Sequence, residues 1–192
     1  MTLAEIRKEI DAIDPEIKAL FLRRMAVAKY VAQVKYEAGD EIYKPDRERE
    51  IISRLTSDVA PELKAEYTAF ILKIMEVARK YEYGMIYDWD PSSLDSLLDQ
   101  VDVKEEDRYV IIRMTRPDCC NSMSQVLSMI GDYGFNMKQM TLLRENVQDG
   151  TVEFELVIRG NLGDTAMRKL VYQLWKEALA LDIVGSCGDV VL

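Results

Sequence analysis

The sequence of 192 residues contains no histidine. This absence excludes the Ser-His and Cys-His pairs that activate nucleophiles, zinc sites built on imidazole, and imidazole general bases. The sequence also shows no glycine-rich phosphate loop and no residues at metal-ligand spacing. We therefore expect no metal ion and no cofactor, and a chemistry that relies on other side chains.

Cysteine and long apolar segments are scarce as well. There are three cysteines, an odd number, and two of them, Cys119 and Cys120, are adjacent. The first residues, MTLAEIRKEI, lack the apolar centre of a secretory signal, and no apolar run is long enough to span a membrane. These features predict a cytoplasmic protein with reduced thiols and no membrane partner.

Basic charge is also in short supply. Lysine and arginine total 25 against 34 aspartate and glutamate residues, which gives a formal net charge of −9 shared by both halves of the chain. Because nucleic-acid binders carry clustered positive charge, we expect no nucleic-acid partner. The content of 48% hydrophobic and 31% charged residues is typical of globular proteins. The length suits two small domains.

A long amphipathic helix is predicted at the N-terminus. Residues 3–37 contain no glycine, and their apolar residues recur at steps of three and four up to Gly39. Unbroken, this helix is about 50 Å long, so a second chain is needed to cover it. Pro15 is expected to kink this helix or to end a short first helix. The apolar positions at its start are Leu3, Ile6, Ile10, Ile13, Ile17, Leu20 and Phe21.

Proline marks the start of two further helices. Pro45 suits the first turn of a helix that reaches about Ser57, and Pro61 that of a helix over residues 61–83. Gly84 and the acidic segment that follows it predict a linker with at most one short helix. We therefore expect a three-helix domain at residues 1–84 and a linker at residues 85–107.

The period changes after the linker. Alternating and β-branched segments predict strands at RYVIIRM, NMKQMTLLRE, TVEFELVIRG and IVGSC. Helical patterns lie at NSMSQVLSMIGDYG and DTAMRKLVYQLWKEALAL. The order βαββαβ predicts a ferredoxin-like domain at residues 108–192, so the expected fold class is a two-domain α + α/β chain.

Two cations share an otherwise apolar stripe of the first helix. At about 100° per residue, Lys35 lies about 20° from Arg24, whereas Arg7 points about 100° away from Arg24. Arg7 therefore serves the same pocket only if the helix bends or a second chain supplies it.

Two interpretations of these charges stay open. Because a buried cation is costly unless it is paired, Arg24 and Lys35 could simply form structural ion pairs with Glu48 or Glu82. Taken as a set, the charges also suit a site for a small dianion, because arginine forks bind carboxylates. That set consists of Arg7, Arg24, Lys35, Arg47 and Glu48.

The segments LAEIRKEIDAIDPEIKALFLRRMAVAKYVAQVK and IYKPDREREIISRL resemble the all-helical chorismate mutases. The resemblance extends from residue 3 to about residue 83 and is strongest to the mutase domain of the bacterial bifunctional chorismate mutase–prephenate dehydratases. It implies an intertwined homodimer whose long first helices pair. It also implies a pericyclic rearrangement of chorismate to prephenate, an isomerase reaction that needs neither proton transfer nor a covalent intermediate.

The resemblance also implies roles for individual residues. Arg24 and the partner subunit's Arg7 would bind the two carboxylates of chorismate. Lys35 would reach a carboxylate and the ether oxygen. Arg47 would support these contacts, and Glu48 would accept a hydrogen bond from the ring hydroxyl.

Three positions depart from the family pattern. Glu82 stands where a glutamine usually donates to the ether oxygen, and a glutamate donates only when it is protonated, so its pocket must raise its pKa. Lys44 replaces an aspartate that is frequent in relatives, and Ala78 replaces a common serine. We therefore take Lys35 and Glu82 as the candidate catalytic residues, with Glu82 dependent on its protonation.

The second half resembles the ACT-type regulatory domain that ends prephenate dehydratases. FNMKQM and DIVGSCG match segments of that domain, but the phenylalanine-binding signatures differ, so the fold is expected without its ligand. Such a domain could also join dimers into a higher oligomer. The dehydratase domain itself is absent, because the linker cannot hold it. The differing signature positions are Asn121, Ser122, Met123, Thr141, Leu142, Leu143 and Arg144.

The sequence thus predicts a dimeric chorismate mutase of phenylalanine and tyrosine biosynthesis, with an ACT-like regulatory domain. The main alternative is a non-catalytic protein that uses the mutase fold to sense chorismate, prephenate or an amino acid, which Lys44 and Glu82 favour. A helical dimerisation module is a third interpretation, and the cations on the apolar stripe argue against it.

Overall fold

The computed structural model describes residues 1–189 and begins with one very long helix. Helix α1 spans Leu3–Ala38 and is capped by Thr2, which exchanges hydrogen bonds with Glu5 in a capping box. It ends at Gly39, whose φ of 65° is a left-handed conformation that glycine adopts without strain. The expectation that Pro15 ends a short first helix is wrong, because α1 continues through this residue.

The next two helices begin at prolines, as expected. Helix α2 spans Pro45–Leu55, and a single 3-10 turn, η1, at Pro61–Leu63 leads into α3 at Lys64–Trp89. Helix α3 therefore passes the expected end at residue 83 and includes Gly84. The rings of Tyr83 and Tyr87 both pack on Tyr172, at centroid distances of 6.1 and 5.8 Å. This packing offsets the helix penalty of glycine, which is about 1 kcal/mol.

The segment after α3 is short and packed. It contains the 3-10 turn η2 at Pro91–Leu94 and the single-turn helix α4 at Asp95–Leu98. Leu94 is completely buried in the main hydrophobic core. The segment between α3 and β1 is therefore held to the rest of the protein by the buried side chain of Leu94. The division of the chain at residues 84 and 107 stays a prediction.

The C-terminal half forms one antiparallel sheet with two helices. Its elements are β1 (Tyr109–Pro117), α5 (Ser122–Asp132), β2 (Asn136–Asn146), β3 (Thr151–Arg159), α6 (Thr165–Glu177) and β4 (Ala180–Cys187). The strand order is β2-β3-β1-β4, so β1 and β3 lie in the centre. The expected βαββαβ order and the two-domain α + α/β fold class are confirmed. The last helix is shorter than expected because β4 already begins at Ala180.

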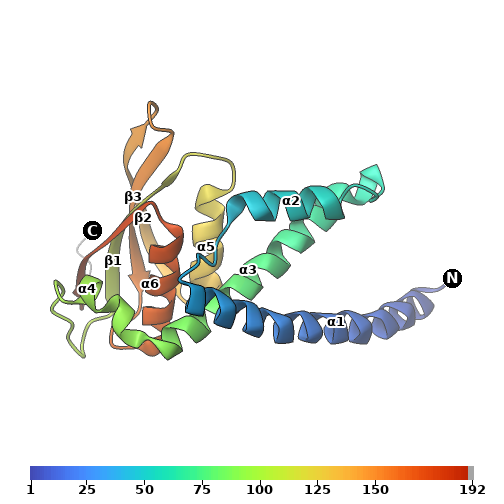
Figure 1. The fold of residues 1–192 in the computed structure, drawn as a ribbon, viewed down its shortest axis with the longest axis horizontal. Coiled ribbons are helices and arrows are strands. Elements are labelled where there is room, and N and C mark those ends of the chain that lie inside the picture. The colour runs from blue at the N-terminus through green and yellow to red at the C-terminus, as the bar shows by residue number, and fades with distance from the viewer. Residues whose placement is uncertain (190–192) are drawn as a thin grey trace.

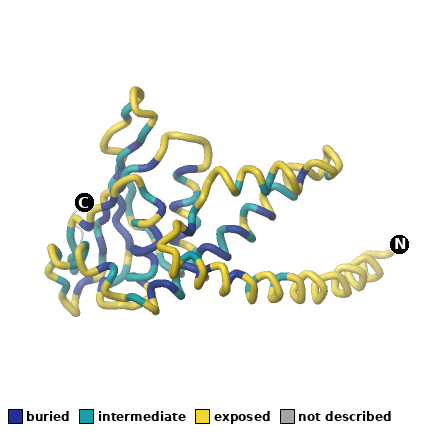
Figure 2. The backbone as a smooth tube through the Cα atoms, viewed as in Figure 1, coloured by how far each residue is buried: buried dark blue, intermediate teal, exposed yellow. Residues whose placement is uncertain are grey.

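The two halves meet along α3. Figure 1 shows α5 and α6 between the sheet and α3, whereas α1 extends away from the sheet toward the N-terminus. The core is continuous across this junction, because Tyr83 and Ile86 of α3 belong to the same buried cluster as Phe154 and Leu174. Figure 2 shows the opposite situation along the first half of α1, which is exposed on all sides. In residues 1–189, no helix has the length and apolarity needed to cross a membrane.

Candidate active site on the helical region

Three charged residues of the expected site gather where α1 crosses α3. The Lys35 ammonium donates a hydrogen bond of 2.8 Å to the carbonyl of Ile42, just beyond the end of α1. The Arg24 guanidinium donates one of 3.3 Å to the carbonyl of Ile74 on α3. Glu82 of α3 is only 8% exposed and lies within the electrostatic reach of both cations. That these three residues share one substrate pocket stays a prediction.

Burial controls the protonation of this cluster. The pKa of the Glu82 carboxyl is raised because burial disfavours its charged form, although Lys35 and Arg24 oppose this shift. The pKa of Lys35 is lowered, again mainly by burial, and the negative charge of Glu82 opposes the shift. A buried, protonated Glu82 can therefore donate a hydrogen bond, which its ionised form cannot.

The simple ion-pair interpretation does not describe Arg24 and Lys35. Among residues 1–189, no salt bridge joins either cation to Glu48 or Glu82. Their hydrogen bonds go to main-chain carbonyls, which carry no formal charge. Both cations therefore retain the capacity to bind an anion.

The structure does not bring Arg7 or Arg47 to this cluster. Arg7 lies 28 positions before Lys35 on α1, about 40 Å along the helix axis. The side chain of Arg47 is 61% exposed and pairs with Glu50 at 3.0 Å on the same helix. Arg7 can therefore approach Arg24, Lys35 and Glu82 only from a second copy of the chain.

Glu48 has a partner that the sequence analysis missed. Its carboxylate forms an ion pair with Arg79 of α3, and Arg79 also contacts Glu177 of α6 at 3.2 Å. A signal was present, because Arg79 lies four residues after Met75 and four before Tyr83, both buried on the same stripe of α3. A charged residue at such a position needs a buried partner.

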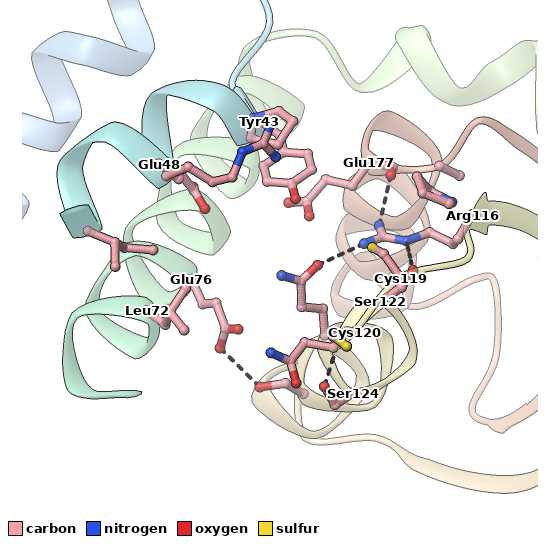
Figure 3. A pocket seen from close by; sticks show the side chains of 18 of the residues that line it. Tyr43, Glu48, Leu72, Glu76, Arg116, Cys119, Cys120, Ser122, Ser124 and Glu177 are labelled. Atoms are coloured by element: carbon pink, nitrogen blue, oxygen red, sulfur yellow. Dashed lines mark hydrogen bonds between the residues drawn. The ribbon is translucent and has the colours of Figure 1, made fainter. Parts of the chain in front are cut away.

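Two hollows lie beside the helices, and the smaller one includes Arg24 in its lining. An open groove of about 580 Å³ lies between α1 and α3, with Phe21, Arg24, Phe70 and Ile74 among the residues along it. A larger cavity of about 790 Å³ lies between α2 and α3 on one side and α5 and α6 on the other. Figure 3 shows Glu48 and Glu76 on the helical side of this cavity, with Arg116 and Glu177 opposite.

The larger cavity has firmly held walls on its C-terminal side. The Arg116 guanidinium is buried and donates hydrogen bonds of 2.8 Å to the Glu177 carbonyl and of 2.8 Å to the Gln125 side chain. Cys119 and Cys120 lie at its rim as exposed free thiols. Within residues 1–189, no group of histidine, cysteine, aspartate and glutamate side chains could hold a metal ion.

Comparison with known proteins bears on the helical half. Residues 6–83 match the family model described as chorismate mutase type II. This segment is therefore similar to chorismate mutases of that type. The matched segment includes the α1 residues Arg7, Arg24 and Lys35 as well as Glu82, close to its end. The resemblance inferred from the sequence is thereby confirmed for this part of the chain.

Individual relatives match a shorter stretch. The chain is 47% identical over 53 residues to a protein named chorismate mutase from Methanocaldococcus jannaschii, covering 28% of this chain and 54% of that protein. It is 45% identical over 53 residues to a bifunctional chorismate mutase/prephenate dehydratase from Aquifex aeolicus, covering 28% of this chain and 15% of that protein. A T-protein from Haemophilus influenzae is 41% identical over 46 residues, which are 24% of this chain and 12% of that protein.

These matches leave much of each protein uncovered. This chain spans about half the length of the first of these relatives and less than a fifth of the other two. The family model ends at residue 83 and does not extend into the sheet.

Proposed function

We propose that this chain is a chorismate mutase that converts chorismate to prephenate in phenylalanine and tyrosine biosynthesis. The observation that carries the proposal is that the buried Glu82 lies within the electrostatic reach of Lys35 and Arg24, in a segment that matches the chorismate mutase type II family. In the rearrangement, the ether C–O bond breaks while a C–C bond forms, and the ether oxygen gains negative charge. Binding of the compact conformer and hydrogen-bond donors at that oxygen are sufficient for catalysis.

Several residues have a defined task in this proposal. Arg24 binds one carboxylate of the substrate, and Lys35 donates to a carboxylate and to the ether oxygen. Protonated Glu82 is the second donor to the ether oxygen, and its raised pKa supports this task. Glu48 accepts a hydrogen bond from the ring hydroxyl, whereas Arg47, which is exposed and paired with Glu50, has no task in this arrangement.

A homodimer completes the site. The apolar side chains along the first half of α1 are exposed, Leu20 at 62%, and exposed apolar surface of this extent is typical of an interface. A partner helix laid into the groove between α1 and α3 would cover them. It would also deliver the partner subunit's Arg7 to the carboxylates of the substrate, which Arg7 of the same chain cannot reach.

The C-terminal half is proposed to be an ACT-like regulatory domain. Its βαββαβ order and its strand order β2-β3-β1-β4 support this proposal. Such a domain also offers sheet edges and helix faces through which dimers could assemble further. The protein is proposed to act in the cytoplasm.

Measurement of chorismate loss with the wild type and Arg24→Ala tests the mutase proposal. Because Arg24 would bind a substrate carboxylate, its removal should lower kcat/KM by about 10²- to 10³-fold. Turnover by the wild type, lost in Arg24→Ala with the fold retained, supports the proposal. Absence of turnover at every pH between 5 and 9 would contradict it.

A second candidate function is a non-catalytic sensor of chorismate or prephenate. Lys44 favours it, because this extra cation lies close enough to Lys35 to lower the pKa of Lys35. Its ammonium is held by Asp40 at 2.6 Å. Binding of chorismate in calorimetry without any turnover would select the sensor over the enzyme.

A further inference from the structure

The buried cation Arg79 connects α2 and α3 to α6. The Arg79 side chain is 5% exposed, and the Glu177 side chain has no exposed surface. One nitrogen of Arg79 contacts Glu48 on α2, and another lies 3.2 Å from Glu177 on α6. Because a planar guanidinium binds two carboxylates in a fixed geometry, the three side chains constrain one another.

Neighbouring groups hold this cation in place. The ring of Tyr43 lies against the guanidinium, 4.8 Å from its central carbon to the ring centroid. The Gln173 amide donates a hydrogen bond of 3.0 Å to the same Glu177 oxygen that contacts Arg79. Figure 3 shows Tyr43 between Glu48 and Glu177 at the wall of the larger cavity. The guanidinium of Arg79 is therefore held by Tyr43 against its planar face and by Glu48 and Glu177 at its nitrogens.

The pairing leaves half of the Glu48 carboxylate available. Arg79 contacts Oε1, and within residues 1–189 no hydrogen bond to Oε2 is present. In the proposed mutase site, the free oxygen is the one that can accept the substrate hydroxyl. Rotation of the Glu48 side chain away from the site would break the buried pair and leave Arg79 with Glu177 alone.

We propose that Arg79 is a positioning residue that aims Glu48 at the substrate, and that Glu177 of the C-terminal half holds Arg79 for this task. This inference rests on the proposed mutase function. The C-terminal half then supports the active site, because Arg79 pairs with Glu48 at one side and with Glu177 of α6 at the other. The matched family segment ends before α6, so the support comes from outside the mutase domain.

The pKa of Glu48 should respond in opposite directions to the loss of Arg79 and to the loss of the Glu177 charge. Burial raises the pKa of the Glu48 carboxyl, Arg79 lowers it, and the negative charges of Glu177 and Glu76 raise it. Loss of the Arg79 cation should therefore raise the pKa of Glu48 further. Loss of the Glu177 charge should lower the pKa of Glu48, because the repulsion between the two carboxylates is removed while the attraction of Arg79 remains.

Other charged groups face the same space. Glu82 lies within reach of Arg79 and Glu48, and Lys35 of α1 also senses Glu48. The pKa of Tyr43 responds to Arg79, Glu48 and Glu177. Removal of Arg79 should therefore shift the titrations of Glu48 and Glu82 together, whereas removal of the Glu177 charge should lower the pKa of Glu48.

The test compares pH profiles of kcat/KM for the full chain with those of Arg79→Met, Arg79→Lys and Glu177→Gln. In the free enzyme, the acid limb of kcat/KM reports the ionisation of Glu48. It should move to higher pH in Arg79→Met and to lower pH in Glu177→Gln. KM for chorismate should rise about tenfold in Arg79→Met with kcat within about twofold, because a contact made equally in ground and transition states is lost. Arg79→Lys should restore most of the loss in KM.

A matched control separates positioning from domain attachment. Lys169 of α6 pairs with Asp88 of α3 at 2.7 Å, so it joins the same two helices away from Glu48. Lys169→Met should leave both the limb and KM as in the wild type. If Arg79→Met proves too unstable to assay, Glu177→Gln carries the test, because glutamine retains the shape of the glutamate side chain.

The outcomes distinguish this inference from the function on which it rests. Wild-type turnover, together with an acid limb of kcat/KM that moves to higher pH in Arg79→Met and to lower pH in Glu177→Gln, supports positioning through Arg79. Wild-type turnover with an acid limb that does not move in Arg79→Met or in Glu177→Gln, and with an unchanged KM in Arg79→Met, overturns the inference alone. No wild-type turnover at any pH overturns both the proposed function and this inference.

Discussion

The two halves of this chain differ in how far they bury their apolar side chains. The sheet half has a closed core that it shares only with α3, in which Phe154, Leu156 and Leu174 are fully buried. The helical half is not, because α1 buries only Ala28 and Ala32 although apolar residues recur along its whole length. The comparison teaches that the sheet half buries its apolar residues within one chain, whereas the helical half leaves an apolar face exposed that the proposed second chain would cover.

The largest effect is expected from a charge placed on the exposed face of α1. Ile10→Glu together with Ile17→Glu should convert the proposed dimer to a monomer and abolish mutase activity, because each site would lose the partner subunit's Arg7. Light scattering coupled to size exclusion measures the mass, and an assay of chorismate loss measures the activity. Lys8→Glu is the control, because Lys8 points about 200° away from Ile10 on the same helix. A double variant that remained dimeric and active would contradict this account of α1.

A core substitution in the sheet half should have the complementary effect. Phe154→Ala removes a fully buried ring and should lower the free energy of unfolding by about 3–5 kcal/mol, measured by urea denaturation. The dimer should persist below the transition, because the sheet core does not depend on the partner. Val147→Ala, at an exposed turn, should change stability by less than about 0.5 kcal/mol. Loss of the dimer in folded Phe154→Ala would show that the halves are not independent in this respect.

A smaller effect is expected where α1 and α3 meet. The pKa of Glu82 is raised, so its protonated donor form prevails at acid pH and is lost as the pH rises through that pKa. The wild-type kcat should therefore fall by about tenfold for each pH unit above the pKa. Glu82→Gln should give a flat profile, because an amide donates at every pH. A fall of the same steepness in Glu82→Gln would assign the titration to another group.

The comparison also explains what the sequence could predict. Local patterns were sufficient for α1, whose apolar steps end at Gly39, and for the strands, whose alternation places Ile112 and Met114 inside. They were insufficient for α3 beyond Gly84, because packing on Tyr172, some ninety residues away in the sequence, outweighs the local glycine signal.

The residues of the site also differ in whether the sequence pattern or the packing of distant segments determines their partners. Arg24, Lys35 and Glu82 could be placed together from helical spacing and a family resemblance. The Arg79 pairs could not, because Glu48 and Glu177 lie on different helices and meet Arg79 only once all three have packed. Arg47 illustrates the reverse case, since a motif position alone did not show that its side chain pairs with Glu50.

The most direct test of a site shared by two subunits is complementation between two inactive variants. Arg7→Ala removes the residue that the partner supplies, and Lys35→Ala removes one supplied by the chain itself. Co-expressed chains that associate at random should recover about a quarter of wild-type mutase activity, because half of the dimers are mixed and each mixed dimer has one intact site. Recovery to that level is the predicted result. Mixed dimers as inactive as either parent would contradict a site built from both subunits.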